Sequence, residues 1–171
     1  MPLKKPNEVP KLPKTRKKSA ETAKKAIPAK KSDKIEYICF PFFKFDEVLG
    51  KEFTTIRIQT ISEFTSFAYE LSISATLEKN VIDIVILGLS TKMNYLPKVE
   101  PARADALFDN LTGDFTVNVI KQDGSINSAV FHFNIFKKEI ILIDKFMPEK
   151  KNNRLFCDFA VDEALFSFSK E

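Results

Sequence analysis

Hydrophobic and polar residues alternate along most of this chain. The clearest run covers 66–77, where every second residue is apolar and most of the others are polar. A period of two is typical of a β-strand with one buried face. The apolar members of the run are Phe67, Tyr69, Leu71, Ile73, Ala75 and Leu77. We therefore expect one long strand that directs these side chains into a core.

Two neighbouring segments extend this pattern. Ile56 and Ile58 alternate with polar residues before the run, and the segment VIDIVILGL (81–89) follows it. The second segment is apolar on both faces except for Asp83, which predicts a central strand or a strand covered by another layer. We expect the three segments to pair in order as a meander.

A second meander is predicted from 115 to 146. Asp123-Gly124 is a strong hairpin signal, because this pair tolerates the positive φ angles of a tight turn. Strands over 139–146 and on both sides of the hairpin complete the unit. The predicted inward side chains of the hairpin are Phe115, Val117, Val119, Ala129, Phe131, Phe133 and Ile135.

The ends of the folded region are also strand-like. The segment 35–45 contains Pro41, which lacks an amide hydrogen, so this strand is expected at a sheet edge or with a bulge. The segments 154–160 and 164–169 are expected to form a terminal hairpin after the loop 147–153.

About eight strands with short turns and no long helix predict an all-β, antiparallel β-sandwich over 35–171. The spacing of Leu111, Gly113 and Phe115 resembles the point where the chain crosses between sheets in immunoglobulin-like domains. Those domains usually carry Tyr at the position of Phe115. The resemblance covers ten residues, implies an immunoglobulin-like sandwich and carries no information on function.

Residues 1–34 differ from the rest of the chain. They contain five prolines and no Phe or Tyr, whereas all 17 Phe residues lie between Phe40 and Phe168. Twelve Lys or Arg residues face three acidic residues here, a net charge of about +9, and the remainder carries about −5. We expect a disordered basic tail, in which 19–26 becomes helical only on contact with a partner.

Basic residues in a flexible segment neutralise phosphates and release counterions, which gives sequence-independent binding to nucleic acid. An acidic protein surface in a larger assembly is the alternative partner for the tail. The tail has no aromatic residue and one Arg, so it lacks the groups for base recognition. The candidate polyanion-binding residues are Lys4, Lys5, Lys11, Lys14, Arg16, Lys17, Lys18, Lys24, Lys25, Lys30 and Lys31.

Catalytic signals are scarce. His132 is the only histidine and is predicted on the outward face of its strand. Asp105, Asp109 and Asp114 do not have the spacing of a calcium loop, and the four isolated glycines form no phosphate-binding loop. We therefore expect a non-catalytic binding or scaffolding domain without a metal or cofactor.

The aromatic residues suggest an alternative function. One group comprises Tyr37, Phe40, Phe42, Phe43 and Phe45, and a second comprises Phe156, Phe159, Phe166 and Phe168. If the sheets enclose a cavity, these rings would hold a hydrophobic ligand. The other interpretations are core packing in a chain without Trp, or a protein interface at the Phe-rich edge strands.

Cys39 and Cys157 lie in apolar, strand-like runs and are expected to be buried, reduced thiols. The basic start is not followed by the apolar stretch of an export signal, and no apolar run is long enough to span a membrane. These observations predict a cytoplasmic protein.

Overall fold

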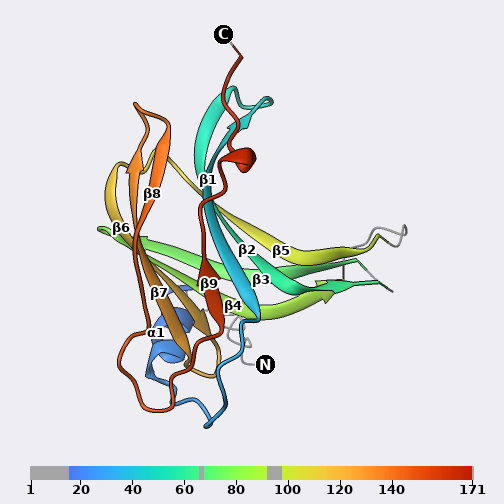
Figure 1. Cartoon of the computed structure of the whole chain (residues 1–171), viewed down its shortest axis with the longest axis vertical. Coiled ribbons are helices and arrows are strands. Elements are labelled where there is room, and N and C mark those ends of the chain that lie inside the picture. Colours follow the sequence, from blue (N-terminus) through green and yellow to red (C-terminus); the bar gives the residue numbers. More distant parts are fainter. Residues whose placement is uncertain (1–15, 66–67, 92–97, 171) are drawn as a thin grey trace, which may run out of the picture.

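A computed structural model of the chain describes residues 16–65, 68–91 and 98–170. The described residues form nine strands, one α-helix and one short 3₁₀ helix (Figure 1). In chain order these are α1 (Arg16–Lys25), β1 (Tyr37–Asp46), β2 (Lys51–Phe64), β3 (Tyr69–Glu78), β4 (Val81–Thr91), β5 (Glu100–Phe108), β6 (Gly113–Lys121), β7 (Ile126–Asn134), β8 (Glu139–Phe146), β9 (Cys157–Phe159) and η1 (Glu163–Leu165).

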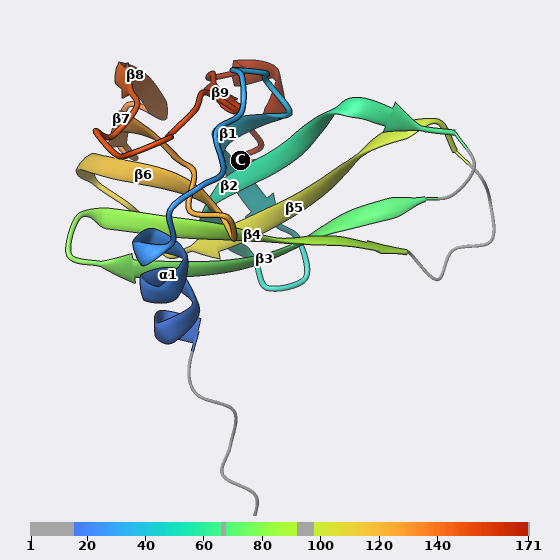
Figure 2. The same ribbon diagram turned by 90° about the horizontal axis from the view of Figure 1, so that it is seen from below.

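The strands form two sheets, which confirms the predicted all-β sandwich. One sheet has the order β5-β2-β1-β9 and the other has the order β3-β4-β6-β7-β8. The two sheets pack face to face around a single large core to which both contribute (Figures 1 and 2). Most pairings are antiparallel, but β4 pairs with β6 and β1 pairs with β9 in parallel. The β4–β6 pairing arises because β5, which lies between them in sequence, belongs to the other sheet.

The predicted meander of β2, β3 and β4 is wrong at its first step. β3 and β4 form a hairpin, whereas β2 lies in the opposite sheet between β5 and β1. Ile56 and Ile58 of β2 are buried in the same core as Leu71 of β3, but they enter it from the opposite sheet and not from a neighbouring strand. Alternation reveals that a strand has one apolar face, but it does not distinguish pairing from face-to-face packing. The second meander, β6-β7-β8, is confirmed.

The core includes most of the predicted inward positions. Leu71, Phe131 and Phe133 are buried, and Tyr69, Ile73, Phe115 and Ile135 are partly buried against them. Leu77 is an exception, because 43% of its surface is exposed near the end of β3. Phe67 lies outside the described residues. The remaining predicted positions that the structure buries are Ile56, Ile58, Val117, Val119 and Ala129.

Pro41 does not lie in an edge strand, contrary to the prediction. β1 is flanked by β2 and β9, but β9 pairs only with the first three residues of β1, Tyr37–Cys39. Further along the same side of β1, the carbonyl of Phe43 accepts a hydrogen bond from the amide of Ser167. Pro41 lies between these two contacts, where no ladder hydrogen bond requires its missing amide hydrogen.

The expected terminal hairpin is also absent from the described residues. β9 is only three residues long, and the chain then follows β1 through the short helix η1. The crossing predicted from Leu111 and Gly113 is confirmed. Leu111 is buried and donates its amide hydrogen to Thr54 Oγ1, while the chain passes from β5 to β6 in the opposite sheet.

Candidate polyanion-binding surface

The structure describes seven of the eleven predicted basic residues. Lys4, Lys5, Lys11 and Lys14 lie outside the described residues. Arg16, Lys17 and Lys18 form the beginning of α1, and Lys24 and Lys25 form its end. Lys30 and Lys31 are exposed in the segment that joins α1 to β1. For residues 16–34 the structure therefore differs from the predicted disordered tail.

Helix α1 packs on the outer face of the five-stranded sheet (Figure 2). Its buried side chains are Ala20 and Ala23, which contact Val85 of β4, Ile120 of β6 and Ile126 of β7. A ten-residue helix is marginal in water, so its stability must come from this packing. The helix begins at Arg16 instead of after Ser19, and its contact partner is the domain itself. This layer covers Val85 and so explains one outward apolar position of β4, whereas Leu87 and Leu89 further along the strand are exposed.

The one acidic residue within the apolar run of β4 has a partner on the helix. Asp83 forms an ion pair with Lys24 and also accepts a hydrogen bond of 2.8 Å from Asn118 Nδ2. Asn118 in turn accepts a hydrogen bond of 2.6 Å from the hydroxyl of Ser128. This polar row crosses β4, β6 and β7 beside the apolar contact of α1. Lys24 is therefore engaged in holding the helix.

Lys150 connects three segments at the C-terminal end of α1. Its Nζ donates hydrogen bonds to the carbonyl oxygen of Lys24, at 2.6 Å, and to that of Gly124, at 2.8 Å. The last carbonyl groups of a helix have no partner within it, so Lys150 satisfies one of them. Burial lowers the pKa of Lys150, and the nearby charge of Asp123 opposes this effect. Lys150 thus joins α1, the β6–β7 hairpin and the loop 147–153.

The segment after α1 is held against the same loop. Asn152 Nδ2 donates to the carbonyl oxygen of Pro28 at 3.1 Å, and Asp33 accepts from the amide of Leu155 at 2.9 Å. The amide of Lys34 donates to the carbonyl oxygen of Leu155 at 3.0 Å. These contacts place the segment 28–34 alongside 150–155, two regions that are far apart in sequence.

Several other cations are neutralised within the fold. Glu36 accepts hydrogen bonds from Lys121 Nζ at 2.7 Å and from the buried Arg154 at 3.2 Å. Burial raises the pKa of Glu36, but the two cations outweigh it and the net pKa lies below the ordinary value. Arg57 makes two hydrogen bonds to Asp105, at 2.7 and 2.9 Å.

Five lysines remain exposed in this region without an ion pair to a described residue. We call them the basic face: Lys25, Lys30, Lys31, Lys34 and Lys151. The sequence-based list omits Lys34 and Lys151. The only sequence signal for Lys151 is the pair Lys150-Lys151 in a predicted loop, which does not reveal that the loop lies beside 28–34. Asp33 and Glu149 are exposed nearby, so the face is basic but not purely cationic.

Six members of the two aromatic groups join one core cluster: Tyr37, Phe43, Phe156, Phe159, Phe166 and Phe168. Phe43 of β1 lies 5.4 Å from Phe166 and 6.0 Å from Phe168 between ring centroids. Phe159 contacts Phe131 in the core at 6.2 Å. Phe42, Phe43, Phe156 and Phe159 are buried, and the other members of the two groups are partly buried. The rings therefore act mainly as core.

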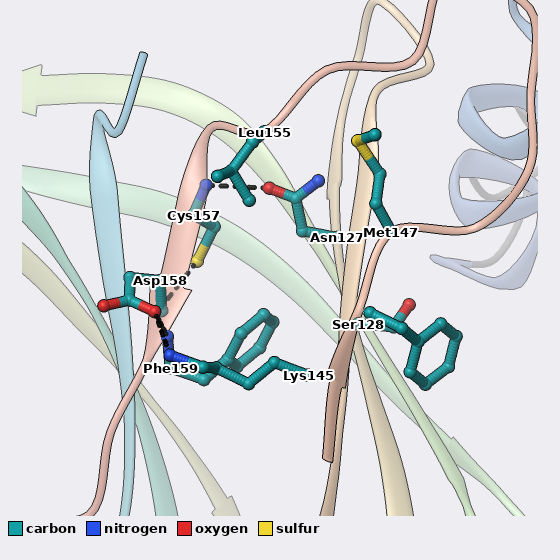
Figure 3. Close-up of a pocket in the computed structure, with 9 residues that line it drawn as sticks. Asn127, Ser128, Lys145, Met147, Leu155, Cys157, Asp158 and Phe159 are labelled. Atoms are coloured by element: carbon teal, nitrogen blue, oxygen red, sulfur yellow. Dashed lines mark hydrogen bonds and ion pairs between the residues drawn. The ribbon is translucent and has the colours of Figure 1, made fainter. Parts of the chain in front are cut away.

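A surface pocket of about 270 Å³ lies where β8 approaches β9 (Figure 3). Met147, Leu155 and Phe159 are among its apolar lining residues. Lys145 Nζ donates to Asp158 Oδ1 at 2.9 Å beside it and so joins the two sheets. The thiol of Cys157 also borders the pocket but is buried. This pocket is slightly smaller than the usual range for small-molecule sites, about 300–1,000 Å³.

The remaining candidate groups are dispersed. His132 is partly exposed on the outer face of β7, as predicted, and its Nδ1 lies 2.6 Å from Asp114. Asp109 pairs with Lys51, and Asp105 pairs with Arg57. Among the described residues, no three or more His, Cys, Asp and Glu side chains gather as a metal site. No helix within the described ranges is long and apolar enough to cross a membrane.

Comparison with known proteins finds no matching family model, no matching curated protein and no matching solved structure.

Proposed function

We propose that this protein is a non-catalytic binding domain whose basic N-terminal region engages the phosphates of nucleic acid. The observation that carries the proposal is the basic face. Its five exposed lysines have no carboxylate partner among the described residues, and they lie at the end of α1 and on two segments that hydrogen bonds hold side by side. The ion pairs of Lys24, Lys121 and Arg154 hold the fold, so these three cations are engaged elsewhere.

The chemistry of the face favours phosphate over bases. Lysine is a strongly hydrated point charge, whereas base recognition uses the planar fork of Arg or stacking on aromatic rings. No aromatic residue precedes Tyr37 in the chain. We expect binding that depends on salt and is nearly independent of nucleotide sequence.

A salt titration tests the proposal. The full-length protein is titrated into fluorescent single-stranded RNA, single-stranded DNA and duplex DNA, each in two unrelated sequences, from 50 to 200 mM KCl. The logarithm of the association constant should fall linearly with the logarithm of salt concentration, with a slope of about −0.7 to −0.9 per phosphate neutralised. A polyglutamate of matched charge represents the alternative acidic partner. Absent or salt-independent binding would refute the proposal, and preference for polyglutamate would favour an acidic protein surface.

A further inference from the structure

The position of the basic face depends on helix α1, which the domain itself holds in place. α1 contributes Lys25, and the segment that follows it contributes Lys30, Lys31 and Lys34. The fifth lysine, Lys151, comes from the loop between β8 and β9. The face exists only while these two regions remain side by side (Figure 2).

Two adjacent lysines of this loop differ in what their side chains do. Lys150 is partly buried and donates two hydrogen bonds to backbone carbonyls, one of them at the end of α1. Lys151 is exposed, and its side chain makes no hydrogen bond or ion pair to a described residue. The first side chain is therefore used to hold the helix, and the second is available to a ligand.

Pre-ordering matters for affinity. Ordering a flexible chain on binding costs free energy, so charges that are already held in position bind more tightly than the same charges on a free tail. The segment 28–34 is tied to the body by Asn152, Asp33 and the amide of Lys34. Its lysines are thus presented from a partly ordered backbone.

We propose that the basic face is a preformed phosphodiester-binding surface, in which Lys34 and Lys151 contact phosphate and Lys150 is a positioning residue that keeps α1 docked. This inference rests on the proposed function and assigns two contacts outside the predicted set. The ligand chemistry is the phosphodiester backbone that RNA and DNA share, and the nucleic acids compared in the test distinguish the two sources.

The test compares four full-length variants that each remove one positive charge. Lys151→Gln and Lys150→Gln alter the two adjacent loop residues. Lys137→Gln is the matched control, because Lys137 is exposed in the turn after β7, at the opposite end of that strand from the β6–β7 hairpin. Lys34→Gln provides an independent measurement of the second proposed contact. Binding to 20-nucleotide RNA and DNA is measured across the same KCl series.

We expect Lys151→Gln and Lys34→Gln each to flatten the salt slope by about 0.7–0.9, the contribution of one phosphate contact. Lys137→Gln should leave the slope unchanged. Hydrogen exchange of the free proteins should show α1 amides exchanging about 10-fold faster or more in Lys150→Gln, and at the wild-type rate in Lys151→Gln. Asp83→Asn removes the other polar tie of the helix and should also accelerate exchange in α1.

The outcomes distinguish a failure of the proposed contacts from a failure of the proposed function. If the wild-type protein binds but Lys151→Gln and Lys34→Gln both behave like Lys137→Gln, the contacts lie elsewhere and this inference is wrong while the proposed function stands. Unchanged exchange of α1 in Lys150→Gln would overturn the positioning role. If the wild-type protein binds none of the nucleic acids, the proposed function fails and the phosphate contacts fail with it.

Discussion

The carbonyl oxygen of Ala26 lies directly against Gly124 in the β6–β7 hairpin. A Cβ atom at position 124 would be 2.1 Å from that oxygen, far inside van der Waals contact. Gly124 also has a φ of +97°, a conformation that side-chain-bearing residues rarely adopt. This glycine therefore serves both the hairpin and the close approach of the chain that leaves α1.

Gly124→Ala should displace the end of α1 and destabilise the domain by roughly 1–3 kcal/mol, because it adds both backbone strain and a clash with backbone atoms. Urea unfolding measures the stability, and hydrogen exchange of the α1 amides reports the displacement. Gly113→Ala is the matched control, since Gly113 has the same φ of +97° but nothing within 4 Å of its added Cβ. Equal exchange in α1 for both variants would contradict the proposed contact.

Asn127 joins the two sheets from a buried position. Its Oδ1 accepts hydrogen bonds of 2.8 Å from the amides of Phe156 and Cys157, and its Nδ2 donates to the carbonyl oxygen of Arg154 at 2.9 Å. Asn127→Ala should cost roughly 2–4 kcal/mol, because it leaves several backbone groups unpaired where water does not reach them. Thermal or urea unfolding gives the value.

Asn134→Ala controls for the loss of an asparagine that accepts from two amides. Asn134 Oδ1 accepts from Phe136 and Lys137 in an exposed turn, where water replaces the lost bonds. We expect a cost below about 1 kcal/mol for this variant. A similar loss of stability in both variants would show that the cost of Asn127→Ala does not come from the burial of Asn127.

The two thiols should be unreactive in the native protein. Cys39 and Cys157 are free thiols in the structure. Both are almost fully buried, which confirms the predicted burial, and burial raises the pKa of both thiols. Because the thiolate is the reacting species, a thiol reagent at pH 8 should modify neither residue until the protein unfolds. Denaturation without reductant should then release two reactive thiols. Rapid labelling of the native protein, or no thiol after denaturation, would contradict this structure.

The ion pair between Lys145 and Asp158 should make stability depend on acid pH. The hydrogen bond from Lys145 lowers the pKa of Asp158 below its ordinary value. A carboxyl group with a lowered native pKa stabilises the fold above its unfolded pKa, about 3.9, and this contribution is lost as pH falls through the native value. Wild type should therefore exceed Asp158→Asn in stability at pH 6, and the difference should shrink toward pH 2.

Urea unfolding at each pH measures that difference, which should be small because both side chains are about half exposed. Lys145→Met removes the other member of the ion pair and should lose the same pH-dependent contribution to stability. A difference between wild type and Asp158→Asn that is constant from pH 6 to pH 2 would show that the pair does not stabilise the fold.

The strands themselves could be predicted because alternation is a local property of the chain. Ile56 and Ile58, or Phe131 and Phe133, show their buried face through their immediate neighbours alone. The partner of each strand is not local information. β2 pairs with β1 and β5 instead of β3, and Leu77 is exposed despite its regular spacing, because both outcomes depend on packing between distant segments.

The sequence by itself determined the class of fold, the strong hairpin at Asp123-Gly124, the crossing near Leu111 and the concentration of basic charge before residue 35. Only the tertiary structure decided which residues the basic N-terminal region contacts. Lys24 meets Asp83 across 59 residues, and Lys150 reaches the carbonyl of Lys24 across 126. Such contacts form because burying Ala20 and Ala23 on the sheet stabilises a helix too short to persist alone. That gain depends on a complementary surface that exists only after the sheet has folded.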